Sequence, residues 1–432
     1  MEKYTLFWFR RDLRIEDNHG LFRALSGKNK VIPLFIFDQQ ILKKLPKSDA
    51  RLEYILLALG TIGIAMKKNR CSLGMYHGTP QAIFKTLIST WPIEKVICNE
   101  DYEPYARDRD ASIKSLLEDH QISFETYKDQ VIFEKDEIVK DDGTPYRVYT
   151  PFSRKWLHHF SENELPYYPS ETLLDKLADI EQPQLDLTDL GFISSKVSSP
   201  QHTFNNERIT AYEATRNFPA IDQTTRIGTP LRFGTLSVRE MVRKSAAIAN
   251  PTFLKELIWR EFFMQILWHF PHTMTQSFKP QYDRIEWRND PVEFEKWCGG
   301  NTGYPLVDAG MRQLNQTGFM HNRVRMLVGS FLCKHLLIDW RLGEAYFAEK
   351  LLDYEMSSNL GNWQWVAGCG VDAAPYFRIF NPTEQIKKFD KQHEYIQKWV
   401  PEYQEMTYPQ PIVDHKFARE RCLKTYKAAL NA

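Results

Sequence analysis

A stretch in the C-terminal half of the chain places an acid, a base and an indole within five residues. The segment LKELIWREFF, at 254–263, sets Glu256 and Arg260 four residues apart on one face of an expected helix, with Trp259 beside them. Such a pair is most often a surface ion pair. This helix is apolar nearly all round, which predicts burial. Because an unpaired buried charge is costly, we expect both charges to contact a ligand or another charge.

A second group of polar residues precedes an expected helix start. Residues 217–240, NFPAIDQTTRIGTPLRFGTLSVRE, bring together Thr224, Thr225, Arg226, Gly228 and Thr229. Hydroxyls, backbone N–H groups and a small residue ahead of a helix suit a pyrophosphate group. The alternative interpretation is an ordinary capped loop.

Two further stretches, GFMHNRVRM at 318–326 and LLDYEMSSNLGNWQW at 351–365, are rich in polar side chains. They contribute His321, Asn322, Arg323, Arg325, Asp353, Glu355 and Asn359. Asn322 could cap its helix, and Arg325 with Asp353 could form a structural bridge. The polar groups are too many for all of them to be caps in an apolar helical region, so we expect a polar ligand site.

Tryptophans are concentrated in the same half. Eight of the eleven lie beyond residue 250, and two of them flank Gln364 in the stretch NWQWVAGCGVDAAPYFRIFNP. One interpretation is a large aromatic core. The other is that indoles serve there as stacking faces and oxidisable rings, each with an N–H that needs a partner when buried.

Composition and charge limit the class of the protein. The 432 residues suffice for two or three domains, and the net charge of +1 means that nucleic-acid contact would need locally clustered Lys and Arg. The six cysteines include no C-x-x-C pair, which fits a reducing cytoplasm and gives no sign of a metal site. Neither a membrane-spanning run nor a signal peptide is visible, so we expect a cytoplasmic protein.

The first third of the chain alternates β-rich and helical segments. Strands are expected at 4–9, 31–37, 72–77 and 95–100, which are apolar on consecutive residues as buried parallel strands are. Helical spacing between them, at 51–68 and 79–90, predicts an α/β fold with a doubly wound parallel sheet. No G-x-G-x-x-G follows the first strand, so the usual dinucleotide fingerprint is missing.

The remainder changes character twice. Residues 131–205 are rich in Pro, Ser, Asp and Lys, and read as a surface connection between domains. From 206 to 432 the pattern is helical, with helices expected at 236–249, 252–270, 302–318 and 321–338. We therefore expect an α/β domain at 1–130, a linker at 131–205 and an all-helical domain at 206–432.

Ordered blocks along nearly the whole chain give it a family resemblance. They begin with FWFRRDLRIEDN at 7–18 and continue through TTRIGTPLRFG, ELIWREF, GYPLVDAGMRQL, MHNRVRM, IDWRLGEAYF and DAAPYFRIFNP to YPQPIVDHK at 408–416. With these blocks the chain resembles the photolyase/cryptochrome family of blue-light flavoproteins. Within the family it is most similar to class I cyclobutane pyrimidine dimer photolyases.

The resemblance implies that the helical domain holds FAD in a folded-back conformation. By position, the residues lining the phosphates would be Tyr212, Thr224, Thr225, Arg226 and Gly228. Those around the isoalloxazine and its linker would be Arg260, Asn322, Arg325, Asp353, Glu355 and Asn359. Asn359 stands where photolyases keep an asparagine near flavin N5 and plant cryptochromes keep an aspartate. A neutral amide supplies no proton to that nitrogen, which favours repair over signalling.

The resemblance also implies roles for the tryptophans and for a substrate pocket. Trp363, Trp340 and Trp287 fall on the family's electron-transfer chain, whereas Trp365 looks like a wall of the pocket. The residues that dimer-repairing members use are present as Glu256, Trp259, Asn322, Met326 and Trp365, of which Glu256, Asn322 and Met326 are the catalytic candidates. Arg216 and Arg323 stand at positions resembling phosphate contacts.

Five residues depart from the usual family pattern. These are Gly228 in place of a serine, Glu355 in place of an aspartate, Phe319 in place of a tryptophan and, where relatives read N-N-G-G-W at 359–363, Leu360 in place of an asparagine and Asn362 in place of a glycine. They concern the details of FAD contact and redox tuning rather than FAD binding itself. The (6-4) enzymes carry histidines where Asn322 and Met326 stand here, so that specificity is disfavoured.

The function expected from these residues is light-driven repair of cyclobutane pyrimidine dimers in DNA, by electron transfer from excited reduced FAD to a flipped dimer. The alternative is a cryptochrome-type photoreceptor, including the DASH type, without duplex repair. Residues 99–110, NEDYEPYARDRD, resemble the family's antenna region, so we expect a second chromophore: a folate, a deazaflavin or a flavin. Damaged DNA is the expected partner of a monomeric, cytoplasmic protein that joins the nucleoid when bound to DNA.

Overall fold

The computed structural model describes residues 2–197 and 201–431. Its contacts divide the chain into two compact units. The first unit comprises Met1–Glu137, Leu157–Lys196 and Gly228–Ala247, and the second comprises Ile138–Trp156, Val197–Ile227 and Ile248–Ala432. These ranges do not coincide with those expected from the sequence, because a segment near residue 240 returns to the N-terminal unit and the stretch 131–205 is shared between the two.

The first unit is built on a five-stranded sheet in the order β3-β2-β1-β4-β5, with every pair parallel. The strands are β1 (Tyr4–Phe9), β2 (Lys30–Asp38), β3 (Gly74–Gly78), β4 (Ile93–Asn99) and β5 (Ser123–Tyr127). The α/β class and the four expected strands are confirmed, with ends that differ by one or two residues. The edge strand β5 was not expected, because its sequence SFETY is mostly polar and only partly buried.

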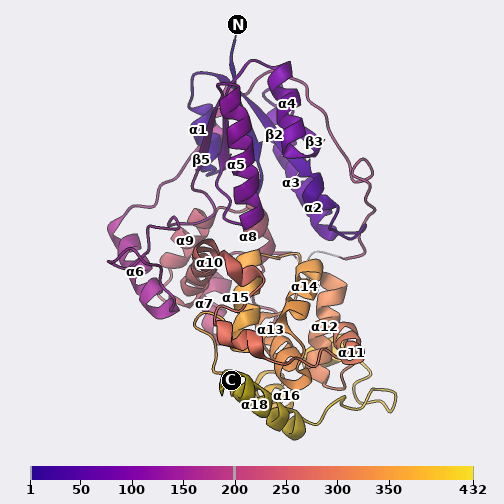
Figure 1. Ribbon diagram of the computed structural model, residues 1–432. Coiled ribbons are helices and arrows are strands. Elements are labelled where there is room, and N and C mark those ends of the chain that lie inside the picture. Colours follow the sequence, from indigo (N-terminus) through magenta and orange to yellow (C-terminus); the bar gives the residue numbers. More distant parts are fainter. Residues whose placement is uncertain (1, 198–200, 432) are drawn as a thin grey trace. The chain divides into compact units, whose positions relative to one another are not determined.

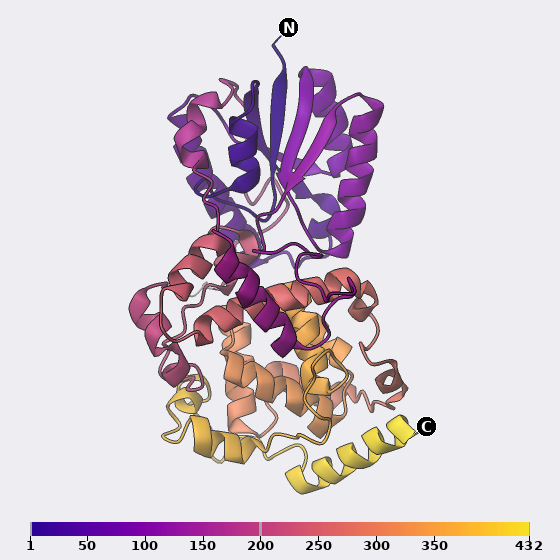
Figure 2. The ribbon, with the colours of Figure 1, turned by 90° about the vertical axis from the view of Figure 1, so that its left-hand side faces the viewer.

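Helices cover both faces of this sheet (Figures 1 and 2). Alternate residues of β1 enter different cores: Phe7 and Phe9 pack with residues of α3, whereas Leu6 and Trp8 pack with residues of α4 and α5. The helical elements with residues in this unit are α1 (His19–Leu25), α2 (Gln39–Leu42), α3 (Ala50–Lys67), α4 (Pro80–Thr90), α5 (Pro104–Asp119), η1 (Ser170–Lys176), α8 (Gly228–Phe233), α9 (Val238–Ala246) and the end of α6 (Tyr149–Glu162).

A buried cluster of four charges ties α9 to the loops that follow the strands. The guanidinium of Arg239 donates to Asp17 Oδ1 at 3.0 Å and to Asp129 Oδ1 at 2.8 Å, and Arg14 donates to both Asp129 oxygens at 2.7 and 2.8 Å. Burial alone would raise the pKa of Asp129, but Arg14 and Arg239 outweigh it and hold that pKa below its ordinary value. The Asp129 carboxyl therefore stays ionised at neutral pH.

The second unit is helical around one large core. Its elements are the first part of α6, α7 (Asn206–Thr215), α10 (Thr252–His269), η2 (Pro271–Met274), η3 (Pro280–Arg284), α11 (Pro291–Gly299), α12 (Pro305–Thr317), α13 (Asn322–Ser330), η4 (Phe331–Leu336), α14 (Trp340–Lys350), α15 (Met356–Ala367), α16 (Pro382–Phe389), α17 (Glu394–Trp399) and α18 (His415–Asn431). The helices expected at 252–270 and 302–318 are confirmed as α10 and α12. The helix expected at 236–249 is α9.

The helix expected at 321–338 is interrupted. It runs as α13 to Ser330 and continues as the π-helical turn η4, which Leu337 ends in a left-handed conformation with φ of 52°. All six cysteines are free thiols. Among residues 2–197 and 201–431, no helix has the length and apolar character needed to cross a bilayer.

Removing the central cation of the buried cluster should destabilise the first unit. We expect Arg239→Met to lower the free energy of unfolding by about 3 kcal/mol or more, because Asp17 and Asp129 then share too few positive partners in a dry environment. Urea unfolding followed by circular dichroism measures the change. Arg70→Met, which breaks an exposed pair with Asp179, is the control and should cost about 1 kcal/mol or less. Equal effects of the two substitutions would contradict the assignment.

Candidate functional site

Glu256 and Arg260 of helix α10 pair with different residues. Glu256 pairs with Arg216, the residue that caps the end of α7, and both side chains are about one-third exposed (33% and 31%). Burial raises the pKa of Glu256 despite the opposing effect of Arg216. Arg260 lies 3.9 Å from the carboxylate of Glu355, the residue ahead of α15. Glu256 and Arg260 therefore each have an oppositely charged partner within the protein.

An aromatic pair lies beside Glu256. The ring of Trp259 stacks on Tyr149 of α6, with 3.7 Å between ring centroids and 7° between planes. The Tyr149 hydroxyl donates to the carbonyl oxygen of Lys255 at 2.8 Å, and its backbone N–H donates to Asp372 at 3.2 Å. The sequence analysis missed Tyr149, because it treated 131–205 as a connection. The aromatic spacing of Tyr149, Phe152 and Trp156, all buried in α6, was the signal.

Ion pairs and amide contacts hold the remaining polar candidates. Arg325 of α13 donates to both Asp353 oxygens, at 3.1 and 2.8 Å, and to the carbonyl oxygen of Met320 at 2.7 Å. The bridge considered between Arg325 and Asp353 is therefore present. Asn359 of α15 donates through Nδ2 to Glu344 of α14, at 2.9 Å to the carboxyl and 3.1 Å to the backbone oxygen. Burial raises the pKa of Glu344, which the sequence analysis did not single out.

Trp363 occupies space that two neighbouring glycines leave open. A Cβ at Gly343 of α14 would overlap the Trp363 ring, and one at Gly329 of α13 would lie 3.5 Å from it. Trp363 is 3% exposed, and its ring contacts Trp297 and Phe347 edge-on, at centroid distances of 6.2 and 5.0 Å. Trp297 is completely buried and belongs to this aromatic cluster, although the sequence analysis assigned it no role.

The other two tryptophans of the expected chain have different surroundings. Trp340 begins α14, is 1% exposed, and has an indole N–H without a partner, while the Arg341 guanidinium lies 4.6 Å from its ring. Trp287 is partly buried and meets Tyr426 of α18 edge-on at 6.0 Å. Trp365 is also partly buried, at the edge of the core.

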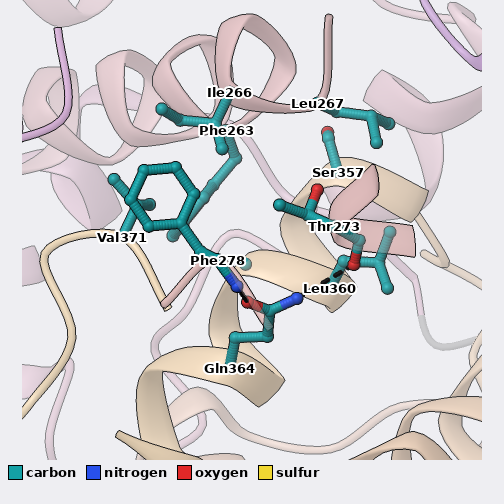
Figure 3. A pocket seen from close by; sticks show the side chains of 10 residues that line it. Phe263, Ile266, Leu267, Thr273, Phe278, Ser357, Leu360, Gln364 and Val371 are labelled. Atoms are coloured by element: carbon teal, nitrogen blue, oxygen red, sulfur yellow. Dashed lines mark hydrogen bonds between the residues drawn. The ribbon is translucent and has the colours of Figure 1, made fainter. Parts of the chain in front are cut away.

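Gln364, between the two tryptophans of α15, has a structural role. Its Nε2 donates to the carbonyl oxygens of Thr273 and Gln276 at 2.9 and 3.1 Å, and its Oε1 accepts from the N–H of Phe278 at 2.8 Å. Figure 3 shows this amide below a small, mostly apolar pocket between α10 and α15. The pocket's lining includes Leu360, one of the departures from the family pattern. Gln364 thus fixes the loop after α10, whereas the flanking indoles of Trp363 and Trp365 do not line this pocket.

The start of α13 corrects one alternative from the sequence. The N-cap of this helix is His321, whose Nδ1 accepts from the Arg323 N–H at 3.2 Å, whereas Asn322 is exposed at the first helical position. His321 thus takes the capping role considered for Asn322, so the side chain of Asn322 is not used as a helix cap. Met326 lies one turn along, with Sδ 3.8 Å from Arg323.

Three arginines of the second unit, Arg216, Arg323 and Arg378, lie near one another. Burial, and then the guanidinium groups of Arg216 and Arg378, lower the pKa of Arg323. Arg323 also donates to Asn217 and lies 4.5 Å from the Phe389 ring. Arg378 is exposed, next to Phe377, which is 60% exposed. The sequence analysis named Arg216 and Arg323 as resembling phosphate contacts but missed Arg378, which lies in the block DAAPYFRIFNP.

Three of the residues expected at a pyrophosphate, Thr224, Thr225 and Arg226, lie in the loop before α8. Thr225 is 4% exposed and its carbonyl oxygen accepts from Thr203, whereas the Thr224 hydroxyl is buried without a partner. Arg226 has a left-handed backbone, with φ of 54°, and pairs through its side chain with Asp222. Tyr212 lies beneath the Arg216 guanidinium, 5.4 Å away. Gly228 begins α8, which clusters with the first unit.

Comparisons with known proteins agree over nearly the whole chain. Family models described as DNA photolyase and as the FAD binding domain of DNA photolyase match residues 5–170 and 253–407. A deoxyribodipyrimidine photo-lyase from Agrobacterium fabrum is 36% identical over 98% of this chain and 98% of its own, and one from Escherichia coli is 34% identical with the same coverage. The chain belongs to the DNA photolyase family.

Solved structures show the same two-part architecture. A bacterial class III photolyase from Agrobacterium tumefaciens has a TM-score of 0.88 at 34% identity, and covers 100% of this chain and 98% of its own. An archaeal photolyase from Sulfolobus tokodaii has a TM-score of 0.81 at 31% identity, with 98% and 100% covered. A Synechocystis cryptochrome, with a TM-score of 0.83 at 24% identity and 98% and 99% covered, shares the fold.

As a member of the DNA photolyase family, the protein is a flavoenzyme of the lyase class, and its second unit contains the FAD-binding domain. The residues present fit that cofactor. The unpartnered Thr224 hydroxyl and the left-handed backbone of Arg226 are suited to a phosphate, which accepts hydrogen bonds from hydroxyl and backbone donors. The ion pairs Arg325–Asp353 and Arg260–Glu355 supply polar groups of the kind that the polar edge of a flavin ring needs.

Filling the space beside Trp363 should disturb this photolyase. We expect Gly343→Ala to lower the free energy of unfolding by about 1–3 kcal/mol through overpacking, and to change the near-ultraviolet circular dichroism of the tryptophans. Gly60→Ala, in α3, is a matched control because its added methyl meets no atom within 4 Å. It should be neutral or raise stability by up to about 1 kcal/mol. A Gly343→Ala protein as stable as the wild type would contradict the packing described.

Proposed function

We propose that this photolyase splits cyclobutane pyrimidine dimers in DNA under blue light. The observation that carries the proposal is the half-buried carboxyl of Glu256, with its raised pKa, beside the stacked rings of Trp259 and Tyr149. The names of the Agrobacterium fabrum and Escherichia coli relatives assign them deoxyribodipyrimidine photo-lyase activity, which supports the same substrate here.

The aromatic residues would hold the dimer after it leaves the duplex. Flipping a nucleotide costs on the order of a few kcal/mol, and least for a damaged pair. Stacking of a base on an aromatic face contributes roughly 1–3 kcal/mol. Trp259 and Trp365 would supply these faces, and Tyr149 would hold the Trp259 ring from its other side.

The polar residues would bind the edges of the pyrimidines. A carboxyl whose pKa is raised by burial can hold a proton and donate it to a pyrimidine carbonyl, and Arg216 limits how far that pKa rises. Glu256 would thus stabilise negative charge that develops on the dimer. Asn322 is exposed at the start of α13, and Met326 lies one turn along the same helix. We assign both to substrate contact.

On the cofactor side, the family chemistry supplies an electron to the dimer from FAD that is reduced and excited by light. Tyr212, Thr224, Thr225, Arg226 and Gly228 would bind the phosphates. The isoalloxazine and its linker would be bound by Arg260, Asn322, Arg325, Asp353, Glu355 and Asn359. Because Asn359 donates its amide N–H to Glu344, its amide oxygen is left to accept from the flavin ring. Trp363, Trp340 and Trp287 would carry electrons inward from the surface.

The alternative function is that of a cryptochrome-type photoreceptor, including the DASH type. The Synechocystis cryptochrome shares only the fold at this level of identity. Glu256 pairs with Arg216 next to the stacked rings of Trp259 and Tyr149. This arrangement favours a repair pocket, because a photoreceptor without a DNA substrate needs neither the ion pair nor the stacked rings. Binding to dimer-bearing and undamaged duplex separates the two functions.

We also propose a second, light-harvesting chromophore in the first unit. The photolyase from Sulfolobus tokodaii contains two FAD molecules, one of which is described as a novel light-harvesting cofactor. In an open parallel sheet, ligands bind at the carboxyl ends of the strands where the strand order reverses, which here is between β1 and β4. Arg11 and Asp101 form an ion pair at those ends, 3.3 Å apart. A folate, a deazaflavin and a flavin are the candidate chromophores.

We further propose that the protein acts as a monomer in the cytoplasm.

Loss of the Glu256 carboxyl should lower repair more than binding. We expect Glu256→Ala to reduce the yield of dimer splitting per absorbed photon about tenfold, as befits one charge-assisted hydrogen bond. Trp259→Ala should instead weaken binding to dimer-bearing duplex about tenfold or more. Illumination of pre-reduced protein with a dimer-bearing oligonucleotide measures the first effect, and a gel shift measures the second. Glu240→Ala, at a partly exposed acid of α9, is the control. Intact repair by both pocket variants would disprove the assignment.

The exposed Arg378 should contact phosphate rather than the lesion. We expect Arg378→Gln to weaken binding to damaged and undamaged duplex alike, and to reduce the slope of log K against log salt by about 0.9. Lys114→Gln, an exposed residue of α5, should leave the slope unchanged. A loss confined to damaged duplex would instead place Arg378 at the dimer.

A further inference from the structure

A small polar cavity in the second unit is lined by residues of neither the proposed dimer pocket nor the tryptophan chain Trp363–Trp340–Trp287. It has a volume of about 50 Å³ and lies between the loop after α7, the end of α12 and α17. Asp222, Arg226, Gln313, His321, Lys398 and Trp399 lie around it. A polar cavity of this size has room for a few water molecules or one small ion.

The ring of His321 offers this cavity a hydrogen-bond donor. Its Nδ1 accepts from the Arg323 N–H, so a neutral ring must carry its hydrogen on Nε2. Burial, and then Arg325 and Arg323, lower the pKa of His321 to about 4, which keeps the ring neutral at neutral pH. The side chain is 3% exposed and Nε2 has no partner within the protein.

Two more donors at the same cavity are buried without partners. They are Nε of Arg226 and the indole Nε1 of Trp399, neither of which can accept a hydrogen bond. Gln313 adds to this excess, because its Oε1 already accepts from the His321 N–H at 3.2 Å and the Tyr395 hydroxyl at 2.6 Å. Only its amide N–H groups remain for a ligand.

The charges around His321 favour an anion. Three guanidinium groups, those of Arg325, Arg323 and Arg226, act on its ring against one carboxylate, that of Asp222. The Asp222 carboxylate is engaged by Arg226, and the Arg325 guanidinium is paired with Asp353, so Arg323 is the cation of these three that has no carboxylate partner among the groups named. Lys398 adds a further positive charge, and the exposed Glu394 a negative one.

We propose that this cavity binds one tetrahedral oxyanion of the size of phosphate or sulfate. His321 Nε2–H, Arg226 Nε–H and Trp399 Nε1–H donate to its oxygens. The backbone of Arg226 remains available to the FAD pyrophosphate, because the side chain is directed to Asp222 and the cavity. The site is thus separate from that of the cofactor and does not depend on dimer repair.

The test is calorimetric titration of the FAD-loaded protein with inorganic phosphate and with sulfate, at constant ionic strength in chloride. We expect saturable binding of one ion. Trp399→Phe, which keeps an aromatic ring but removes the N–H, and His321→Asn, which keeps a helix-capping side chain, should each weaken binding at least tenfold. Trp91→Phe in the first unit should have no effect.

The outcomes separate the possible occupants. Binding that persists with undamaged oligonucleotide present identifies a free ion, whereas displacement by the oligonucleotide identifies a backbone phosphate as the source of the same group. Binding only to FAD-free protein would overturn the proposal, because the cavity would then be part of the cofactor site. Titration without saturation, or equal affinity in both cavity variants and the wild type, would overturn it as well.

Discussion

The close packing of α15 against its two neighbouring helices is the constraint on which the second unit depends. Gly361 of α15 lies where any side chain would overlap the Phe263 ring of α10, and Gly343 of α14 makes room for Trp363. Because Gly361 and Gly343 have no side chain, α15 can pack closely against α10 and α14, and this close packing fixes its axial position and rotation. The same helix, or the residue before it, carries Glu355, Asn359, Trp363 and Gln364, so its position determines where the flavin-side candidates point. Interiors packed this densely move as units rather than deform.

Ion pairing offsets the cost of removing charged side chains from water in the apolar interior of each unit. Arg325 with Asp353, Glu256 with Arg216, and the Asp17–Asp129–Arg239 cluster of the first unit each offset the loss of hydration by a short, directed contact. The positions where pairing is incomplete are therefore informative. The hydroxyl of Thr224 and the three N–H donors around His321 are dry and unpaired, and we read them as places for a ligand.

Much of the fold follows from patterns in the sequence, and the rest was decided by contacts that no local pattern records. Continuous apolar runs identified β1 to β4, but β5 is a polar edge strand that pairing with β4 creates. The 3.6-residue pattern identified α10 and α12, yet could not show that Leu337 ends the helix after Ser330 in a left-handed turn. Tyr149 was missed because its partner Trp259 lies 110 residues away. Family blocks gave the candidate residues, whereas their partners, Glu344 above all, became visible only in three dimensions.

Residues 228–247 cluster with a sheet that is otherwise complete by residue 127, and this has a consequence for how the protein is made. When Asp17 and Asp129 leave the ribosome, Arg239 has yet to be translated. Until about a hundred more residues have emerged, Asp129 has Arg14 as its cationic partner, whereas the carboxylate of Asp17 still lacks both Arg239 and Arg243. A gene cut between residues 129 and 239 would separate Asp17 and Asp129 from Arg239 and Arg243, so the buried charge cluster of the first unit is complete only in one continuous polypeptide.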